Sequence, residues 1–386
     1  LLILGLVFQL GLLVAVKYAG FFFGAFIDLP KLHLPLGVSF YTFHAISYLV
    51  DVYRQKTPPQ KNLLRLGLYL ALFPKLVMGP IVLYHELEPA LAQRTIDAQD
   101  VSDGCFRFTI GLAKKALLAD ALAGLVTGIW GDLASLTVLS AWLGLIGYAL
   151  QLYFDFSGYS DMAIGLGRML GFRFPENFRY PYLCSSISDF WRRWHISLGS
   201  WFKEYLCFPL GGSRTGTLRT LRNLLLVWLA TGLWHGASWN YVLWGLYFGV
   251  LICLEKLLAP RFWAHPRKGL LAGLYRPVCL LLAVLGWVLF RAEDLPAAGR
   301  YFACLFGGAA GASAQARLYL HDFWPVLLLG AVGATPLCAK LAGRLGAKLQ
   351  PGVRAAVQAV LVLALLACST VWLLNGSFQS FVYFQF

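Results

Sequence analysis

Charge is scarce in this sequence. Only 13% of its 386 residues are Asp, Glu, Lys or Arg, whereas soluble domains carry about 25%. Hydrophobic residues make up 59% of the chain, and its mean hydropathy is +0.66. This composition excludes an ordinary soluble protein, and we expect an integral membrane protein.

Acidic residues are scarcer than basic ones: the chain has 18 Asp and Glu and 32 Lys and Arg, which gives a net charge of +14. The basic residues stand mainly in short loops between apolar runs, as at Lys114-Lys115 and from Arg219 to Arg222. Such a distribution is typical of the cytoplasmic loops that orient membrane helices. We therefore expect a lipid bilayer as a partner of this chain and no nucleic acid.

Paired cysteines and common catalytic signatures are missing. The eight cysteines form no CxxC pair and show no zinc-like spacing, so we expect buried thiols without disulfides and no metal site. The sequence contains no GxSxG, HExxH, P-loop or Rossmann fingerprint.

Long apolar runs are abundant, and several reach the ~20 residues that a membrane helix needs. Residues 63–83 form such a run but include Pro74, Gly79 and Pro80, which predicts a broken or re-entrant helix. A coarse count predicts about ten helical segments, some too short or broken to cross fully. The expected segments are residues 1–27, 34–50, 63–83, 104–130, 134–154, 224–257, 270–289, 323–341 and 357–374.

No internal repeat, low-complexity tract or soluble domain interrupts these runs. We expect an all-α, polytopic membrane protein with a single domain over residues 1–386 and a core motif region at 151–250. The chain begins at Leu1, inside an apolar run and without a signal peptide. This start predicts that N-terminal helices precede it.

His195 lies in an unusually polar and aromatic stretch. Between residues 186 and 205, large apolar residues recur at steps of three and four, which predicts one helix at the membrane interface. Ser186 and Asp189 resemble a capping box at its start. The stripe consists of Trp191, Trp194, Leu198, Trp201 and Tyr205. The pattern alone favours an interfacial histidine over a functional one.

His235 has no charged residue near it in sequence, since none stands between Arg222 and Glu255. A continuous helix would carry it about 20 Å from Arg222, deep in the bilayer, before Gly236-Ala237-Ser238 breaks the helix. A polar group at that depth needs a partner or a water-filled cavity and is a functional candidate. Burial also favours the neutral imidazole, the form that a general base requires. The alternative is a structural hydrogen bond between helices.

Further polar residues surround these histidines in sequence. Asp155 and Asp161 flank FSGYS at the end of a clean apolar run, where they could bind an ion, orient a histidine or cap the next helix. Capping is the favoured role. A polar loop, which could line an opening, consists of Asn177, Arg179, Tyr180 and Tyr182.

His44 lies within an expected helical segment, and its role stays open. Lys75 is the one lysine kept as a catalytic candidate. The histidines expected to be solvated are His33, His85, His265 and His321.

Three motifs carry a resemblance to a known family: YFDFSGYSDMAIGLGRMLGFRFPENFRYPYL (153–183), DFWRRWHISLGSWFKEYLCFPLGG (189–212) and LWHGASWNYVLWG (233–245). They resemble the membrane-bound O-acyltransferase family, in particular the branch that O-acetylates alginate and other bacterial polysaccharides. Shorter segments agree with the resemblance, which covers nearly the whole chain: KYAGFF (17–22), LPLGVSFYTFHAISYLVDVYR (34–54), LFPKLVMGPI (72–81) and WVLFRAEDL (287–295).

The resemblance implies a ring of helices around a central tunnel in the bacterial inner membrane. It implies that His235 is the catalytic residue and that His195 is the second functional position. Acetyl-CoA, or another acyl thioester, is the implied donor substrate, with no bound cofactor. A periplasmic esterase-like acetyltransferase is the implied partner. The tentative substrate or tunnel residues are Asp155, Asp161, Asn177, Trp191, Arg192, Trp194, Trp239 and Asn240.

Other functions stay open at this point. The polymer could be alginate, cellulose or peptidoglycan, and a lipid or protein acceptor is the main alternative within the enzyme class. A transporter or flippase would predict inverted repeats, and the sequence shows none. A haem or metal protein that used His195 and His235 as ligands is weaker, because the segments around the two histidines differ in character.

Overall fold

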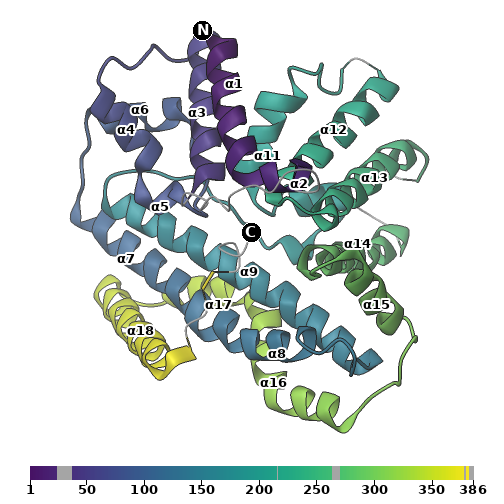
Figure 1. The fold of residues 1–386 in the computed structure, drawn as a ribbon. Coiled ribbons are helices and arrows are strands. Elements are labelled where there is room, and N and C mark those ends of the chain that lie inside the picture. The colour runs from purple at the N-terminus through teal and green to yellow at the C-terminus, as the bar shows by residue number, and fades with distance from the viewer. Residues whose placement is uncertain (24–36, 215, 263–269, 378–379, 382–386) are drawn as a thin grey trace. The chain divides into compact units, whose positions relative to one another are not determined.

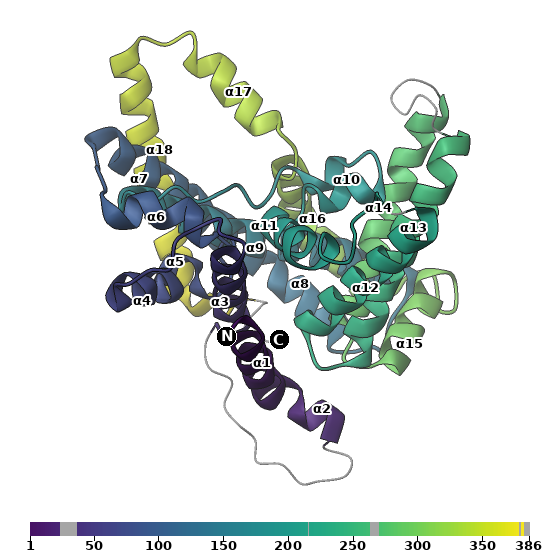
Figure 2. The same ribbon diagram turned by 90° about the horizontal axis from the view of Figure 1, so that it is seen from above.

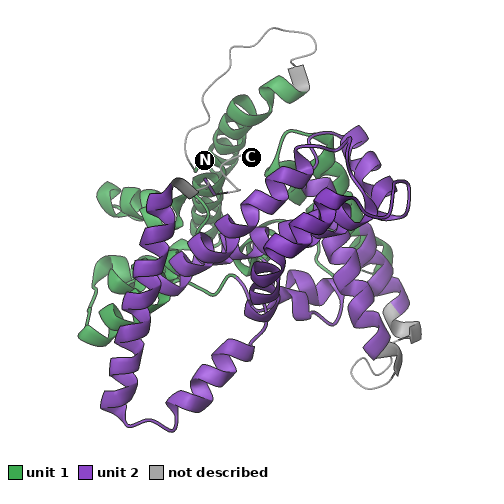
Figure 3. Cartoon of the chain, turned by 90° about the horizontal axis from the view of Figure 1, so that it is seen from below, with its two compact units in different colours: residues 1–108, 162–177, 195–249 green, residues 109–161, 178–194, 250–386 purple. Residues whose placement is uncertain are grey.

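The computed structural model describes residues 1–386 apart from 24–36, 215, 263–269, 378–379 and 382–386. In the described ranges every regular element is a helix (Figure 1), as the composition predicted. The chain divides into two compact units, which Figure 3 colours separately. Each unit is described below on its own.

Unit 1 comprises residues 1–108, 162–177 and 195–249. In this unit α1 and α3 run side by side (Figures 1 and 2). The helices that begin in it are α1 (Leu2–Leu13), α2 (Ala19–Phe23), α3 (Val38–Tyr53), α4 (Leu63–Ala71), α5 (Phe73–Leu76), α6 (Tyr84–Ala92), α7 (Ala98–Ala113), α11 (Ile196–Phe202), α12 (Thr217–His235) and α13 (Trp239–Phe262). Two π-helical turns join them, η1 (Val14–Tyr18) and η4 (Lys203–Cys207).

Unit 2 comprises residues 109–161, 178–194 and 250–386. The helices that begin in it are α8 (Asp120–Trp130), α9 (Val138–Met169), α10 (Ile187–Trp191), α14 (Leu270–Arg291), α15 (Leu295–Leu305), α16 (Ala314–Gly333), α17 (Leu337–Gly346) and α18 (Pro351–Trp372). Its shorter turns are η2 (Lys114–Ala119), η3 (Pro181–Leu183) and η5 (Leu373–Ser377).

Five stretches of the described chain are long and apolar enough to cross a membrane, or six if a bent pair counts as one span. They start in α1, α9, α13, α14 and α18, and the bent pair is α16 with α17, which meet at 67°. The surfaces of α1 and α18 suit lipid, since only 11% and 6% of their windows are buried, whereas 72% of the window in α9 is buried. The protein is therefore an all-α, multi-pass membrane protein.

The predicted break in residues 63–83 is confirmed. Helix α4 starts at the cap residue Asn62, whose side chain accepts from the N–H groups of Leu64 and Arg65, and it ends at Ala71. The short helix α5 has Pro74 in its first turn, where the missing proline N–H costs no hydrogen bond. Residues 77–83 then continue without regular structure. The prolines fix this interruption, as the sequence indicated.

The single interfacial helix expected over residues 186–205 is wrong. Ser186 does cap α10, since its side chain accepts from the Asp189 N–H at 2.9 Å. That helix stops at Trp191, and α11 begins only after His195. His195 itself has a left-handed backbone, with φ of 47°, and so interrupts the helix between the two stretches.

The capping role expected for Asp155 and Asp161 is also wrong. Both lie inside α9, a helix of 32 residues that continues well past the apolar run. Asp155 accepts from Lys115 at 2.8 Å, and Asp161 accepts from Lys114 at 2.6 Å. The buried Lys115 and the half-buried Lys114 of η2 therefore neutralise these carboxylates, and the helix does not need to end there.

Candidate active site

His235 is the last residue of α12 and is only 4% exposed. The next residue, Gly236, has an extended backbone with φ of −174° and ψ of 159°, so the helix stops at the histidine as predicted. The imidazole lies between two indoles: its centroid is 4.8 Å from that of Trp234 and 4.9 Å from that of Trp244. An aromatic enclosure of this kind keeps bulk water away from the ring.

Two glycines bring α13 close to α12. A Cβ at Gly232 would collide with the carbonyl oxygen of Tyr241, and one at Gly245 would collide with the carbonyl oxygen of Trp228. Small residues at such crossings are typical of membrane helices, because they let two backbones touch. The close crossing places Trp244 of α13 against the imidazole of His235.

His195 is 2% exposed and is held through Asn177. The Asn177 Oδ1 atom accepts from the Ser197 N–H at 3.2 Å and from the Ser197 hydroxyl at 2.9 Å. His195 Nδ1 lies 3.2 Å from the same oxygen. Because an amide oxygen only accepts, the neutral imidazole donates through Nδ1–H, and its Nε2 carries the lone pair. Asn177 thus selects the tautomer of His195.

The two histidines lie on either side of Trp234. The Trp234 ring centroid is 4.8 Å from that of His235 and 6.4 Å from that of His195. Phe43 stacks on the same indole at 5.1 Å, so α3 supports it from a third direction. All four side chains belong to unit 1. The sequence marked both histidines, but it gave no role to Trp234 or Trp244.

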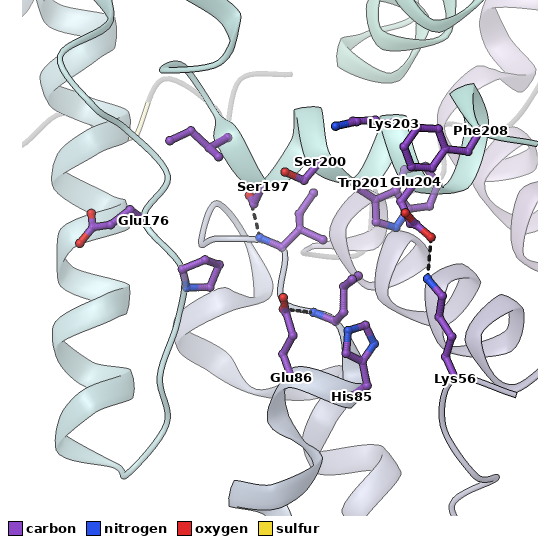
Figure 4. Close-up of a pocket in the computed structure, with 14 residues that line it drawn as sticks. Lys56, His85, Glu86, Glu176, Ser197, Ser200, Trp201, Lys203, Glu204 and Phe208 are labelled. Atoms are coloured by element: carbon purple, nitrogen blue, oxygen red, sulfur yellow. Dashed lines mark hydrogen bonds and ion pairs between the residues drawn. The ribbon is translucent and has the colours of Figure 1, made fainter. Parts of the chain in front are cut away.

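A pocket of about 350 Å³ in unit 1 lies next to the His195 segment. Ser197 and Ser200 of α11 stand on one side of it, and His85 and Glu86 of α6 on the other (Figure 4). The Ser197 hydroxyl also accepts from the Ile81 N–H at 3.0 Å. The hydrogen bonds of Ser197 therefore join the wall of the pocket to Asn177 and through it to His195.

Most acidic groups around the pocket are bound to a donor. Glu204 accepts from Lys56 at 2.6 Å and from Arg54 at 3.2 Å. Arg107 holds both oxygens of Glu176, at 3.0 and 2.6 Å. Lys203 also lines the pocket, with its ammonium 5.6 Å from the centroid of the Phe208 ring. Glu204 and Glu176 are thus paired with cations, while Glu86 accepts from the Leu83 N–H at 2.9 Å.

His85 is half-buried rather than simply solvated, since it belongs to a hydrogen-bonded group. Its Nδ1 lies 3.1 Å from Asp51 Oδ2, which also accepts from the Tyr205 hydroxyl at 2.8 Å. His44 and Lys75 are both fully buried in the same unit. The Lys75 ammonium stands 4.4 Å above the centroid of the Tyr69 ring.

Of the remaining residues singled out in unit 1, Asn240 is 3% exposed and Trp239 is 61% exposed. Trp239 lies beside Phe21, at 5.7 Å between ring centroids. Both follow the break after His235, in the first turn of α13. Asn240 is thus buried close to His235 in sequence, whereas the Trp239 side chain faces outward.

Five of the tentative substrate or tunnel residues fall in unit 2: Asp155, Asp161, Trp191, Arg192 and Trp194. Trp194 is buried and packs on Trp287 at 4.8 Å, and Trp191 lies 6.3 Å from the same ring. Arg192 is 72% exposed and faces Asp189 at 3.7 Å. These residues form an aromatic core and an ion-paired rim within unit 2.

No group of three or more His, Cys, Asp or Glu side chains that could hold a metal occurs among the described residues. Three of the eight cysteines are buried, whereas Cys105, Cys338 and Cys368 are exposed, so the expectation of buried thiols is wrong for these three. The buried imidazoles of His235 and His195 and the amide of Asn177 offer acid–base and hydrogen-bonding groups for chemistry.

The profile of the membrane-bound O-acyltransferase family matches residues 60–267. The chain is 45% identical over 316 residues to a probable alginate O-acetylase, AlgI, of Pseudomonas aeruginosa, which covers 79% of this chain and 60% of the relative. It is 37% identical to a peptidoglycan O-acetyltransferase of Helicobacter pylori, over 77% of this chain and 63% of the relative. It is 29% identical to a teichoic acid D-alanyltransferase of Bacillus subtilis, over 69% of this chain.

The residues matched by the family profile include both histidines and the whole of α12. The chain spans about 60% of the length of the first of these curated relatives. The extent of the match leaves one assignment: this chain belongs to the membrane-bound O-acyltransferase family.

Proposed function

We propose that this protein is an O-acetyltransferase of the bacterial inner membrane that passes acetyl groups from a cytoplasmic thioester toward an extracytoplasmic polysaccharide. The observation that carries the proposal is the enclosed imidazole of His235 at the broken end of α12, which shares Trp234 with His195. The similarity to an alginate O-acetylase and a peptidoglycan O-acetyltransferase supports the same reaction class.

In the proposed reaction, His235 takes the proton of an acceptor hydroxyl while that oxygen attacks the thioester carbonyl. The tetrahedral intermediate collapses by breaking the carbon–sulfur bond. The leaving thiolate then recovers the proton from the imidazolium, so that an ester and a free thiol are formed. The burial of His235 suits this role, because a buried imidazole is held in the neutral form that accepts a proton.

His195 suits the acceptor rather than the oxyanion. Its Nδ1–H is committed to Asn177, so in the neutral ring only Nε2 faces other groups, and Nε2 accepts hydrogen bonds. We assign His195 to orienting the attacking hydroxyl. Stabilisation of the oxyanion needs a donor, and the buried amide of Asn240 is the candidate for that role.

The pocket beside Ser197 is the candidate entrance for the donor, acetyl-CoA or another acyl thioester. The loop after α3 is rich in Lys and Arg, including Arg54, Lys56 and Lys61, which is typical of the cytoplasmic side. Lys203 lines the pocket itself and suits the phosphates of a coenzyme. In this proposal the donor binds as a substrate and no cofactor is held.

The proposed acceptor is an alginate-like polysaccharide, reached through a periplasmic esterase-like partner. Peptidoglycan is the second candidate, because the relative from Helicobacter pylori is a peptidoglycan O-acetyltransferase. The test is transfer of radiolabel from acetyl-CoA, in membranes that contain the protein and a candidate partner, to alginate oligosaccharides or to peptidoglycan fragments.

We expect label on alginate and its loss in the His235→Ala variant. The control is His321→Ala, because His321 lies in unit 2 and its side chain is 83% exposed. Label on peptidoglycan alone would show that the acceptor is peptidoglycan and not an alginate-like polysaccharide. Equal labelling with the His235→Ala variant would reject the proposed role of His235.

A further inference from the structure

The π-helical turn η1 binds the carbonyl end of α12, the helix that carries His235. The Lys17 ammonium donates to the carbonyl oxygen of Trp234 at 2.7 Å and to that of His235 at 3.3 Å. The Tyr18 hydroxyl donates to the carbonyl oxygen of Leu233 at 2.5 Å. Two adjacent side chains of η1 therefore hold three consecutive carbonyls more than 200 positions later in the chain.

Helix α12 needs these donors because of how it ends. The last carbonyls of a helix have no partner within the helix and carry the negative end of its dipole. A left-handed residue after the helix often satisfies them, but Gly236 is extended instead. Lys17 and Tyr18 replace that cap, and a cation is the most favourable group at this end of a helix.

The surroundings fix the Lys17 side chain in this position. Its ammonium lies 6.0 Å from the centroid of the Trp234 ring and 5.9 Å from that of Tyr18, within the range of cation–π attraction. Tyr18 is only 6% exposed. The same turn is π-helical, a rare geometry that often marks functional sites.

We propose that Lys17 and Tyr18 are positioning residues that hold the end of α12 and thereby place the imidazole of His235 for proton transfer. The sequence showed Lys17 and Tyr18 only as part of KYAGFF, without a role. The contact acts through the backbone of His235 and not through its ring. This inference rests on the proposed function, because it assigns the helix end to the base of that reaction.

The test compares three variants with the wild-type protein in membranes. Lys17→Met keeps the aliphatic stem and loses the donors, Lys17→Arg keeps the charge and the donors, and Tyr18→Phe loses one hydroxyl. Lys340→Met is the control, because Lys340 is exposed on α17 in unit 2. The readouts are kcat and KM for acetyl transfer, and the rate at which diethyl pyrocarbonate modifies His235, followed by mass spectrometry.

For Lys17→Met we expect kcat to fall about 10- to 100-fold, the effect of losing charged hydrogen bonds, with KM changed less than about twofold because substrate contacts remain. Lys17→Arg should restore kcat to within about fivefold. The modification rate of His235 should rise severalfold in Lys17→Met, since local opening exposes the ring. This second readout does not depend on activity.

Unchanged kcat and an unchanged modification rate in Lys17→Met would overturn the proposal. The variant that combines Lys17→Met with His235→Ala gives a further test. If the two losses of activity were fully additive in free energy, the proposal would be overturned, because residues that act through one group are not additive. If Lys17→Met does not accumulate, Tyr18→Phe decides: a fall in kcat supports the proposal and no change rejects it. Full activity of the His235→Ala variant would instead reject the proposed role of His235 as the base. The modification rate of His235 in Lys17→Met would still test whether Lys17 holds the end of α12.

Discussion

At the scale of single residues, His235 and His195 are held by contacts with residues that lie elsewhere in the sequence. The sequence singles out His235 because no charged residue stands near it along the chain and a glycine follows it. Trp234, Trp244 and Lys17 contact it from positions that carry no signal of their own, since tryptophans abound and Lys17 is distant in sequence. The sequence places Asn177 in a polar loop and among the tentative tunnel residues, but it does not indicate that the Asn177 side-chain oxygen is shared by His195 and Ser197.

Replacement of Asn177 by Ala tests the link to His195. The change removes the acceptor of the Nδ1–H group and leaves buried donors on Ser197, which costs about 1–3 kcal/mol of stability. We expect acetyl transfer to fall about 10-fold or more because the tautomer of His195 is no longer fixed. The measurement is transfer rate with thermal unfolding, and the control is Gln93→Ala, at an exposed position of unit 1. Wild-type transfer in the Asn177→Ala variant would contradict this role.

At the scale of elements, the breaks that proline and glycine impose were predictable and the others were not. Residues 63–83 and 236–238 are interrupted where the sequence indicated. The stretch 186–205 has good helical periodicity, yet the tertiary contacts of His195 override it. Asp155 and Asp161 looked like helix caps because their partners, Lys115 and Lys114, are 40 and 47 positions away.

The crossing of α12 and α13 leads to a prediction at Gly232. A Cβ there meets backbone at Tyr241 rather than a movable side chain, so Gly232→Ala should separate the helices at a cost of about 1–3 kcal/mol and displace Trp244 from His235. Gly273→Ala in α14 is the matched control, because nothing lies within 4 Å of its Cβ. Thermal unfolding in detergent should show a lower midpoint for the first variant only; equal midpoints would contradict the close crossing.

A second element-scale prediction concerns the contact of α7 with the segment that follows α9. Arg173 donates to Asp100 at 2.5 Å, and this hydrogen bond lowers the pKa of Asp100 below its usual value. A depressed folded-state pKa stabilises the protein above the unfolded value of about 3.9, and this contribution is lost as the pH falls through the folded value. Asp100→Asn should therefore lower the unfolding midpoint at pH 7, with the difference shrinking toward pH 3. A difference that grows on acidification would contradict the pair.

At the scale of the whole molecule, composition alone predicted a multi-pass membrane protein, and the exposed apolar faces of α1 and α18 agree with it. Sequence motifs also predicted the family, because its signatures are long and specific. The division into two compact units could not be predicted, since α7, α9 and α13 each contribute to both units. Apolar periodicity records which residues are buried and not which helices pack together.

Placement of α18 in lipid can be tested with a single cysteine. Leu363 is 66% exposed near the middle of α18, so Leu363→Cys in a cysteine-free variant should stay unlabelled by a membrane-impermeant maleimide added from either side. Lys348→Cys, just before the helix, should be labelled from one side. Labelling of residue 363 in intact membranes would show that α18 faces water.

The measurement that tests the central claim most directly is the single-turnover rate of acetyl transfer from labelled acetyl-CoA by wild type and His235→Ala in the same membranes. Loss of a general base predicts a fall of about two to four orders of magnitude, while the unfolding midpoint stays within a few degrees and His321→Ala keeps the wild-type rate. A folded His235→Ala variant that transfers acetyl groups within about threefold of wild type would contradict the account, because a base worth so little does not carry the reaction.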